Sequence, residues 1–136
     1  MSDPSAPKEV FIASLDRCTQ SAGFVSAFYR RFMSTCDEVR EKFAETDFEQ
    51  QNKMLVRSLR LVAEAMAGSP QGMLELRSRA ETHDRQHLNI RPGLYDLWLS
   101  SVIETAREFD DQWSLDIEDA WKRTLKYAID FMVRRY

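Results

Sequence analysis

Apolar side chains recur at intervals of three and four residues over nearly the whole chain, which is the spacing of one face of an α-helix. The clearest stripe follows a Pro-Gly corner and consists of Leu94, Trp98, Val102 and Ala106. Similar stripes fill most of the remaining sequence, and the alternation typical of a β-strand is found nowhere. Four glycines and four prolines are too few for the many turns of an all-β fold. The pattern therefore predicts an all-α protein.

Breaks between the stripes divide the chain into about six or seven helices. Three segments rich in turn-forming residues interrupt the periodicity: 67–72, 89–93 and 110–114. Two capping-box patterns, in which Glu follows a hydroxyl residue by three positions, predict helix starts at TCDE (35–38) and TDFE (46–49). Ser69, which precedes a proline, and Ser114 are expected to cap two further helices.

Length, charge and cysteine spacing narrow the class of protein. The chain is long enough for one domain, expected at residues 9–136 after a short flexible segment at 1–8. The net charge is −3 and no basic stripe is present, which argues against nucleic-acid binding. No run of about 18 apolar residues could span a membrane, and no apolar signal core opens the chain. Cys18 and Cys36 follow no metal-binding spacing, so we expect a cytoplasmic protein with reduced thiols.

The two histidines of the chain, His83 and His87, lie four residues apart, just before the corner NIRPG. On a helix they would share one face, as a metal pair, as a cofactor ligand with a helper, or as two exposed side chains. A zinc site needs about three or four protein ligands, and neither HExxH nor a cysteine pair completes one. An iron porphyrin needs only one imidazole and an apolar slot. Familiar catalytic motifs are absent from the sequence, so we assign no catalytic residue.

Several segments together resemble the globin family, in particular bacterial single-domain haemoglobins and the globin part of flavohaemoglobins. AFYRRFMSTCDEVREKF (27–43) is similar to their second and third helices, and QQNKML (50–55) to the start of their distal helix. The histidine segment with NIRPGLY resembles the proximal histidine, its corner and the tyrosine that follows. The pair at 120–121 matches the last helix. The resemblance covers roughly residues 10–135 and implies a globin fold that encloses a haem pocket.

On the proximal side, the resemblance implies that His83 ligates the iron of haem b (iron protoporphyrin IX). The Arg79 carbonyl is expected to hold the other ring nitrogen of His83, with assistance from Tyr95. Ile90 is expected to contact the haem from the corner. His87 resembles a second histidine that lies near a haem propionate in myoglobin. Because the spacing from His83 to Tyr95 is slightly longer than in the family pattern, His87 stays open as an alternative ligand.

On the distal side, the resemblance implies that Tyr29 is the hydroxyl donor to a bound ligand. Gln51 is expected to be the distal glutamine, with Gln50 and Lys53 as competing positions. Trp98 matches a tryptophan that donates to the ligand in truncated haemoglobins, and packing in the core is the alternative role. Two further positions are expected against the haem: Phe43, packed flat on it, and Leu55, at the apolar distal position.

These roles imply a haem globin that reversibly binds O2, or NO or CO, at five-coordinate iron, as a monomer or homodimer. An NO dioxygenase is the enzymatic alternative, and it would need a separate reductase as electron donor. A gas sensor, or an interaction module without haem, are further alternatives. Gas transport or binding is therefore the first expectation, and whether the protein is an enzyme stays open.

Overall fold

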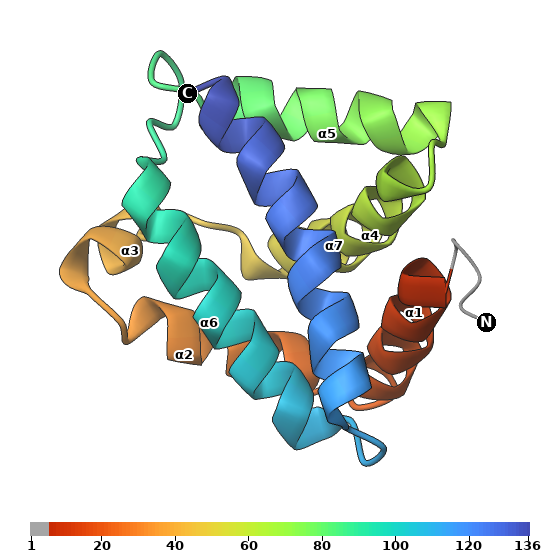
Figure 1. Cartoon of the computed structure of the whole chain (residues 1–136). Coiled ribbons are helices and arrows are strands. Elements are labelled where there is room, and N and C mark those ends of the chain that lie inside the picture. The colour runs from red at the N-terminus through yellow and green to blue at the C-terminus, as the bar shows by residue number, and fades with distance from the viewer. Residues whose placement is uncertain (1–5) are drawn as a thin grey trace.

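The structure, a computed structural model, describes residues 6–136, and the regular elements of this range are all helices. In chain order they are α1 (Ala6–Thr19), α2 (Phe24–Met33), α3 (Asp37–Lys42), α4 (Phe48–Met66), α5 (Pro70–His83), α6 (Pro92–Phe109) and α7 (Leu115–Arg134). Figure 1 shows α7 running diagonally across the molecule, with α5 at one end and α6 beside it. The predicted all-α fold class is confirmed. None of the described helices is long and apolar enough to cross a membrane.

The N-terminal helix starts earlier than expected. Residues 6–8 of the segment expected to be flexible belong to α1, which begins at Ala6. Residues 1–5 of that segment lie outside the part of the chain that the structure describes.

Two of the predicted helix caps are confirmed. The Ser69 hydroxyl accepts a hydrogen bond from the backbone N–H of Gly72 at 3.3 Å, at the start of α5. The Ser114 hydroxyl accepts one from the backbone N–H of Ile117, also at 3.3 Å, at the start of α7. Each cap satisfies an N–H group that has no partner inside its own helix.

Both helix starts predicted from the capping boxes are confirmed, since α3 begins at Asp37 and α4 at Phe48, but neither threonine is the cap. The cap of α4 is Asp47 rather than Thr46, and its carboxylate accepts from two backbone N–H groups of the first turn. An ionised acceptor one residue later is the stronger cap. Helix α3 begins after Cys36, which makes no side-chain cap, while the Thr35 hydroxyl donates to the Phe32 carbonyl at 2.6 Å. Thr35 therefore finishes α2 instead of starting α3.

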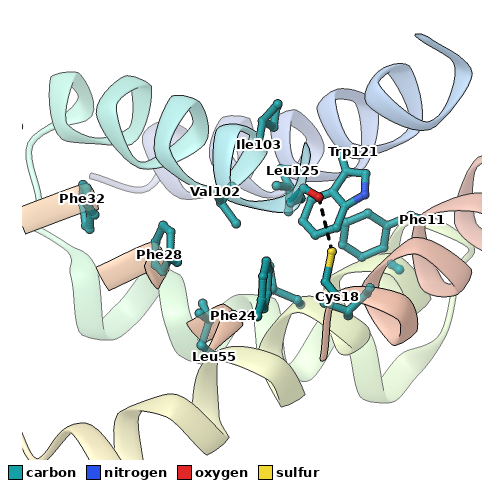
Figure 2. Packing of buried hydrophobic residues seen from close by; sticks show 14 of the residues in the cluster. Phe11, Cys18, Phe24, Phe28, Phe32, Leu55, Val102, Ile103, Trp121 and Leu125 are labelled. Atoms are coloured by element: carbon teal, nitrogen blue, oxygen red, sulfur yellow. Dashed lines mark hydrogen bonds between the residues drawn. The ribbon is translucent and has the colours of Figure 1, made fainter. Parts of the chain in front are cut away.

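Aromatic side chains of α2 form the centre of the core. Phe24 and Phe28 are fully buried and Phe32 nearly so. Figure 2 shows the three rings in a row, between Val102 on α6 and Leu55 on α4. Because these rings face inward, one side of α2 packs against α4 and α6. Tyr29, which follows Phe28 on α2, is buried with them.

A buried polar network ties the two ends of the chain together. Trp121 on α7 donates through Nε1 to the Ser14 hydroxyl at 2.9 Å, and Ser14 donates to Asp110 Oδ2 at 2.6 Å. Arg17 donates to both oxygens of the same carboxylate, at 2.6 and 2.9 Å. Burial alone would raise the pKa of Asp110, but the hydrogen bonds from Arg17 and Ser14 outweigh it and lower that pKa. The network fixes α1 against the end of α6 and the start of α7.

Helices α4 and α5 pack backbone against backbone at Gly72. A Cβ atom at this position would lie 2.3 Å from the backbone nitrogen of Ala65 and 2.5 Å from the carbonyl oxygen of Leu61. Such contacts cannot be relieved by turning a side chain, because the obstructing atoms belong to the α4 backbone. The crossing of α4 and α5 therefore depends on a residue without a side chain.

We expect Gly72→Ala to lower the free energy of unfolding by about 2 kcal/mol, because the two helices must move apart to admit one methyl group. Alanine has the better helix propensity, and this gain offsets at most about 1 kcal/mol of the loss caused by the steric conflict. Gly93→Ala is the matched control, since its added Cβ would meet only the movable end of the Arg91 side chain. Urea unfolding measures both, and equal stability of the two variants would contradict the expected steric conflict.

Candidate functional site

A cavity of about 590 Å³ lies inside the helical framework and is lined from α2 through α7. Most of its lining side chains are apolar. Eight of the nine site residues expected from the sequence line it: Tyr29, Phe43, Gln51, Leu55, His83, Ile90, Tyr95 and Trp98. Residues far apart in the sequence are thus brought to one internal surface, which is the arrangement of a cofactor or ligand site.

The His83 imidazole is held by the end of its own helix. His83 is the last residue of α5, and its Nδ1 lies 2.6 Å from the Arg79 carbonyl oxygen and 3.1 Å from the Thr82 hydroxyl. A carbonyl can only accept, so Nδ1 carries the proton and donates. Nε2 has no hydrogen-bond partner within residues 6–136 and is left as the lone-pair nitrogen. The contact with Arg79 is the one expected from the sequence, whereas Thr82 was not expected.

Burial lowers the pKa of His83, and it outweighs the hydrogen bond to the Arg79 carbonyl, which acts in the opposite direction. The positive charge of Arg79 lowers this pKa further. The imidazole is therefore neutral at pH 7, as a nitrogen must be in order to bind a metal. No group of three or more His, Cys, Asp and Glu side chains in the described part of the chain could hold a metal ion.

The structure places His87 outside the cavity. Helix α5 ends at His83, so His83 and His87 do not share one helical face, as they would if the helix continued. The His87 side chain is exposed, and its Nδ1 lies 2.7 Å from Asp84 Oδ1. The hydrogen bond to Asp84 raises the pKa of His87. Of the two histidines, His83 alone lines the cavity.

Tyr29 and Gln51 form a polar pair within the same, mainly apolar cavity lining. The Gln51 Nε2 amide donates to the Tyr29 hydroxyl oxygen at 3.0 Å. Burial raises the pKa of Tyr29 to about 12, although the hydrogen bond from Gln51 acts against this. The phenol therefore stays protonated. Because its oxygen is occupied as an acceptor, its own O–H remains available as a donor.

Three aromatic rings hold the Tyr29 side chain in place. Phe28 lies 4.9 Å from it between ring centroids, and Phe43 and Phe48 each lie at 5.4 Å. Phe48 was not anticipated, because the segment TDFE was interpreted only as a helix start. Its signal in the sequence is an aromatic residue in the first turn of α4. Trp98 lines the cavity and packs edge-on to Phe28 at 6.1 Å.

The remaining candidates divide between the cavity and the surface. Tyr95 lines the cavity, but its hydroxyl donates to the Met132 sulfur at 3.9 Å and makes no hydrogen bond to His83. Gln50 also lines the cavity, whereas Lys53 lines a hollow on the outside of α4. Of the three candidates for the distal polar residue, only Gln51 donates to the Tyr29 hydroxyl.

The corner that follows His83 is held by side chains from distant parts of the chain. Lys42 Nζ donates to the carbonyl oxygens of Leu88 and Asn89 at 2.9 and 3.2 Å. The Tyr136 hydroxyl donates to the Asn89 side chain, and the Arg85 guanidinium lies over the Tyr136 ring. Asn89 itself has a positive φ of 52°, which asparagine adopts more readily than most residues. The corner is thus shaped by α3 and by the end of the chain.

The whole arrangement matches a known protein from Pseudomonas aeruginosa, whose crystal structure is described as structurally highly homologous to a human haemoglobin. The two chains are 31% identical, the match covers 96% of this chain and 98% of the other, and the TM-score is 0.90. The chain belongs to the globin family. This globin matches no family model and none of the curated proteins compared with it.

Membership of the family suggests a haem cofactor, and the residues of this globin fit one. The cavity volume lies within the usual range of roughly 300–1,000 Å³ for cofactor sites. The lining is mainly apolar, as a flat hydrophobic ring requires. The neutral imidazole of His83 has one unoccupied nitrogen, and a haem iron needs one such ligand from the protein.

Proposed function

We propose that this globin binds haem b through His83 and reversibly takes up O2, or another diatomic gas, beside Tyr29. The observation that carries the proposal is that one cavity is lined by both groups. Its wall holds an imidazole whose Nδ1 is already occupied and a phenol whose oxygen already accepts a hydrogen bond. Haem, when bound, would supply an iron centre with an open position for a diatomic gas.

The side chains of the cavity divide the work. The Arg79 carbonyl orients the His83 ring and fixes its tautomer, so that Nε2 is the nitrogen offered for ligation. Lys42 and Arg79 line the cavity and supply positive charge for the carboxylates of the cofactor. Tyr29 offers its O–H to the gas, while Gln51 holds the phenol in place. Trp98 has an indole N–H without a partner within residues 6–136 and is a second candidate donor.

Titration of the purified protein with hemin tests this function. We expect one haem to bind per chain and to produce an intense Soret absorption band. After reduction, CO should shift that band, because a five-coordinate iron leaves one position open to the gas. A protein that binds no hemin would end the proposal, and a reduced spectrum that CO leaves unchanged would exclude an accessible gas site.

We expect Tyr29→Phe to increase the rate of O2 release from the reduced, haem-loaded protein by at least about fivefold. A hydrogen bond to a charged group contributes roughly 1.5–3 kcal/mol. This range corresponds to a change of about tenfold or more, so fivefold is the smallest effect that we expect. Release of CO should change less, because CO carries less negative charge than O2 when bound. Stopped-flow displacement of O2 by CO measures the rate.

Tyr95→Phe is the matched control for Tyr29→Phe, since it removes a second buried phenol from the same cavity. Its hydroxyl is directed to Met132, so we expect the rate of O2 release to stay near that of the unmodified protein. An unchanged O2 release rate in Tyr29→Phe would refute the proposed role of Tyr29. Equal acceleration in both variants would instead indicate a general loosening of the cavity.

A further inference from the structure

A second hollow, the outer groove, lies on the outside of the molecule between α4 and α5. Its volume is about 1010 Å³, and its lining comes from residues 52–61 on α4 and 71–78 on α5. Ser58 lines the inner cavity and Glu75 lines the outer groove, and the two side chains are hydrogen-bonded at 3.0 Å. The outer groove and the candidate haem pocket thus share one wall.

Apolar side chains form part of the lining of the outer groove. Val56 and Leu61 contribute from α4, and Leu74 contributes from α5. Leu74 is 62% exposed, which makes it one of the most exposed large apolar side chains of the described chain. An apolar hollow with an exposed leucine is the kind of surface that a partner covers.

The α4 side of the outer groove is positively charged. Lys53, Arg57 and Arg60 follow one another at intervals of four and three residues, so they share one face of α4. Lys53 and Arg57 are exposed and have no partner within residues 6–136, whereas Arg60 pairs with Asp16. Glu75, the acidic residue of the lining, is already engaged by Ser58 and Arg79. The groove is therefore cationic on a chain whose net charge is −3.

We propose that the outer groove docks an amphipathic helix of another protein, whose apolar face is flanked by acidic side chains. The apolar face would cover Leu74, Val56 and Leu61, and the acidic flank would pair with Lys53 and Arg57. The α4 lining from Asn52 to Leu61 is about 14 Å long, which matches between two and three turns of a helix. Recognition of an amphipathic helix by an apolar groove is a common binding mode.

Other occupants fit the groove less well. A second copy of this chain, docked groove to groove about a two-fold axis, would bring two cationic surfaces together, which is electrostatically unfavourable. A small amphiphile would be enclosed on one side only, since five lining residues are exposed: Lys53, Arg57, Gln71, Leu74 and Ser78. Binding sites for small molecules usually bury most of the ligand.

The test uses a fluorescently labelled amphipathic helical peptide of leucine and glutamate, about three turns long. Fluorescence anisotropy with the full-length protein should show binding that weakens as salt is added. Lys53→Glu combined with Arg57→Glu should weaken binding by at least about tenfold, because two attractions become repulsions. Leu74→Ala should also weaken binding of the peptide. Because Leu74 is exposed, this variant should stay folded, so weaker binding would reflect the lost apolar contact.

Arg30→Glu combined with Lys126→Glu is the matched control, since it changes the net charge equally at exposed positions on α2 and α7. It should leave binding of the peptide within about twofold of the original. Equal weakening in both double variants would overturn the proposal, because only net charge would then matter. Equally tight binding of a leucine and lysine peptide would also overturn it. So would sedimentation data that show a dimer, if Lys53→Glu with Arg57→Glu separates it into monomers.

Discussion

His83→Ala should abolish stable haem binding, with a loss of hemin affinity of at least about a hundredfold. Removing only a hydrogen-bond partner of a metal ligand commonly costs about 10- to 100-fold in affinity, so removing the ligand itself should cost more. The same change should alter the stability of the haem-free protein little, because the His83 side chain is only half-buried. Hemin titration followed by the Soret band measures the first effect, and urea unfolding measures the second.

His87→Ala is the natural control, because it removes the other histidine from an exposed position outside the cavity. We expect it to bind hemin as tightly as the unmodified protein. If His83→Ala retained an unchanged Soret band and His87→Ala lost it, the ligand would be His87. The corner after α5 would then have to rearrange when haem enters.

Asp110→Ala should cause the largest loss of stability outside the pocket, about 3 kcal/mol. Asp110 is 2% exposed, and its carboxylate accepts hydrogen bonds from Ser14 and Arg17. Removing the carboxylate leaves the charge of Arg17 without its buried partner. Breaking such a pair commonly costs about 3–5 kcal/mol, and the partial exposure of Arg17 favours the lower end. Asp16→Ala, which breaks an exposed pair with Arg60, should cost at most about 1 kcal/mol. Equal losses in the two variants would contradict the structural role of Asp110.

Asp110 should also make stability depend on pH in a defined direction. Its pKa in the folded protein lies below the ordinary value of about 3.9 that applies in the unfolded chain. The stabilisation is therefore complete above about pH 4 and is lost as the pH falls through the lower folded pKa. Asp110→Asn should remove this part of the acid dependence, and urea unfolding between neutral and acidic pH measures it. A variant with the same acid dependence as the original would exclude Asp110 as its source.

The order of the helices could be predicted because periodicity is a local property of the sequence. Ser69 and Ser114 were recognised as caps because no stronger acceptor stands beside either. Thr46 was chosen wrongly, since the pattern cannot rank a hydroxyl against the adjacent carboxylate of Asp47. Thr35 was also wrong, because its hydroxyl reaches back to the Phe32 carbonyl, an acceptor that the motif does not consider.

The pocket was only partly predictable, because its contacts join distant residues. The contact of His83 with the Arg79 carbonyl follows from helix geometry alone, and it could be expected. The contact of Gln51 with Tyr29 crosses 22 positions and depends on how α2 meets α4. The contribution of Phe48 and the direction of the Tyr95 hydroxyl toward Met132 likewise depend on tertiary packing. Resemblance named most positions, but it could not tell which atoms they touch.

The corner after His83 is expected to open more easily than the buried core unfolds. From Arg85 to Asn89 every residue is exposed, so the bonds from Lys42 and Tyr136 hold this segment with little apolar burial. Segments of this kind open locally at a fraction of the free energy needed to melt the core. We therefore expect the corner to influence how long the proposed haem stays bound, and the buried core to govern the melting temperature of the chain. Substitutions at the corner should then shorten the residence time of haem and leave the melting temperature unaltered.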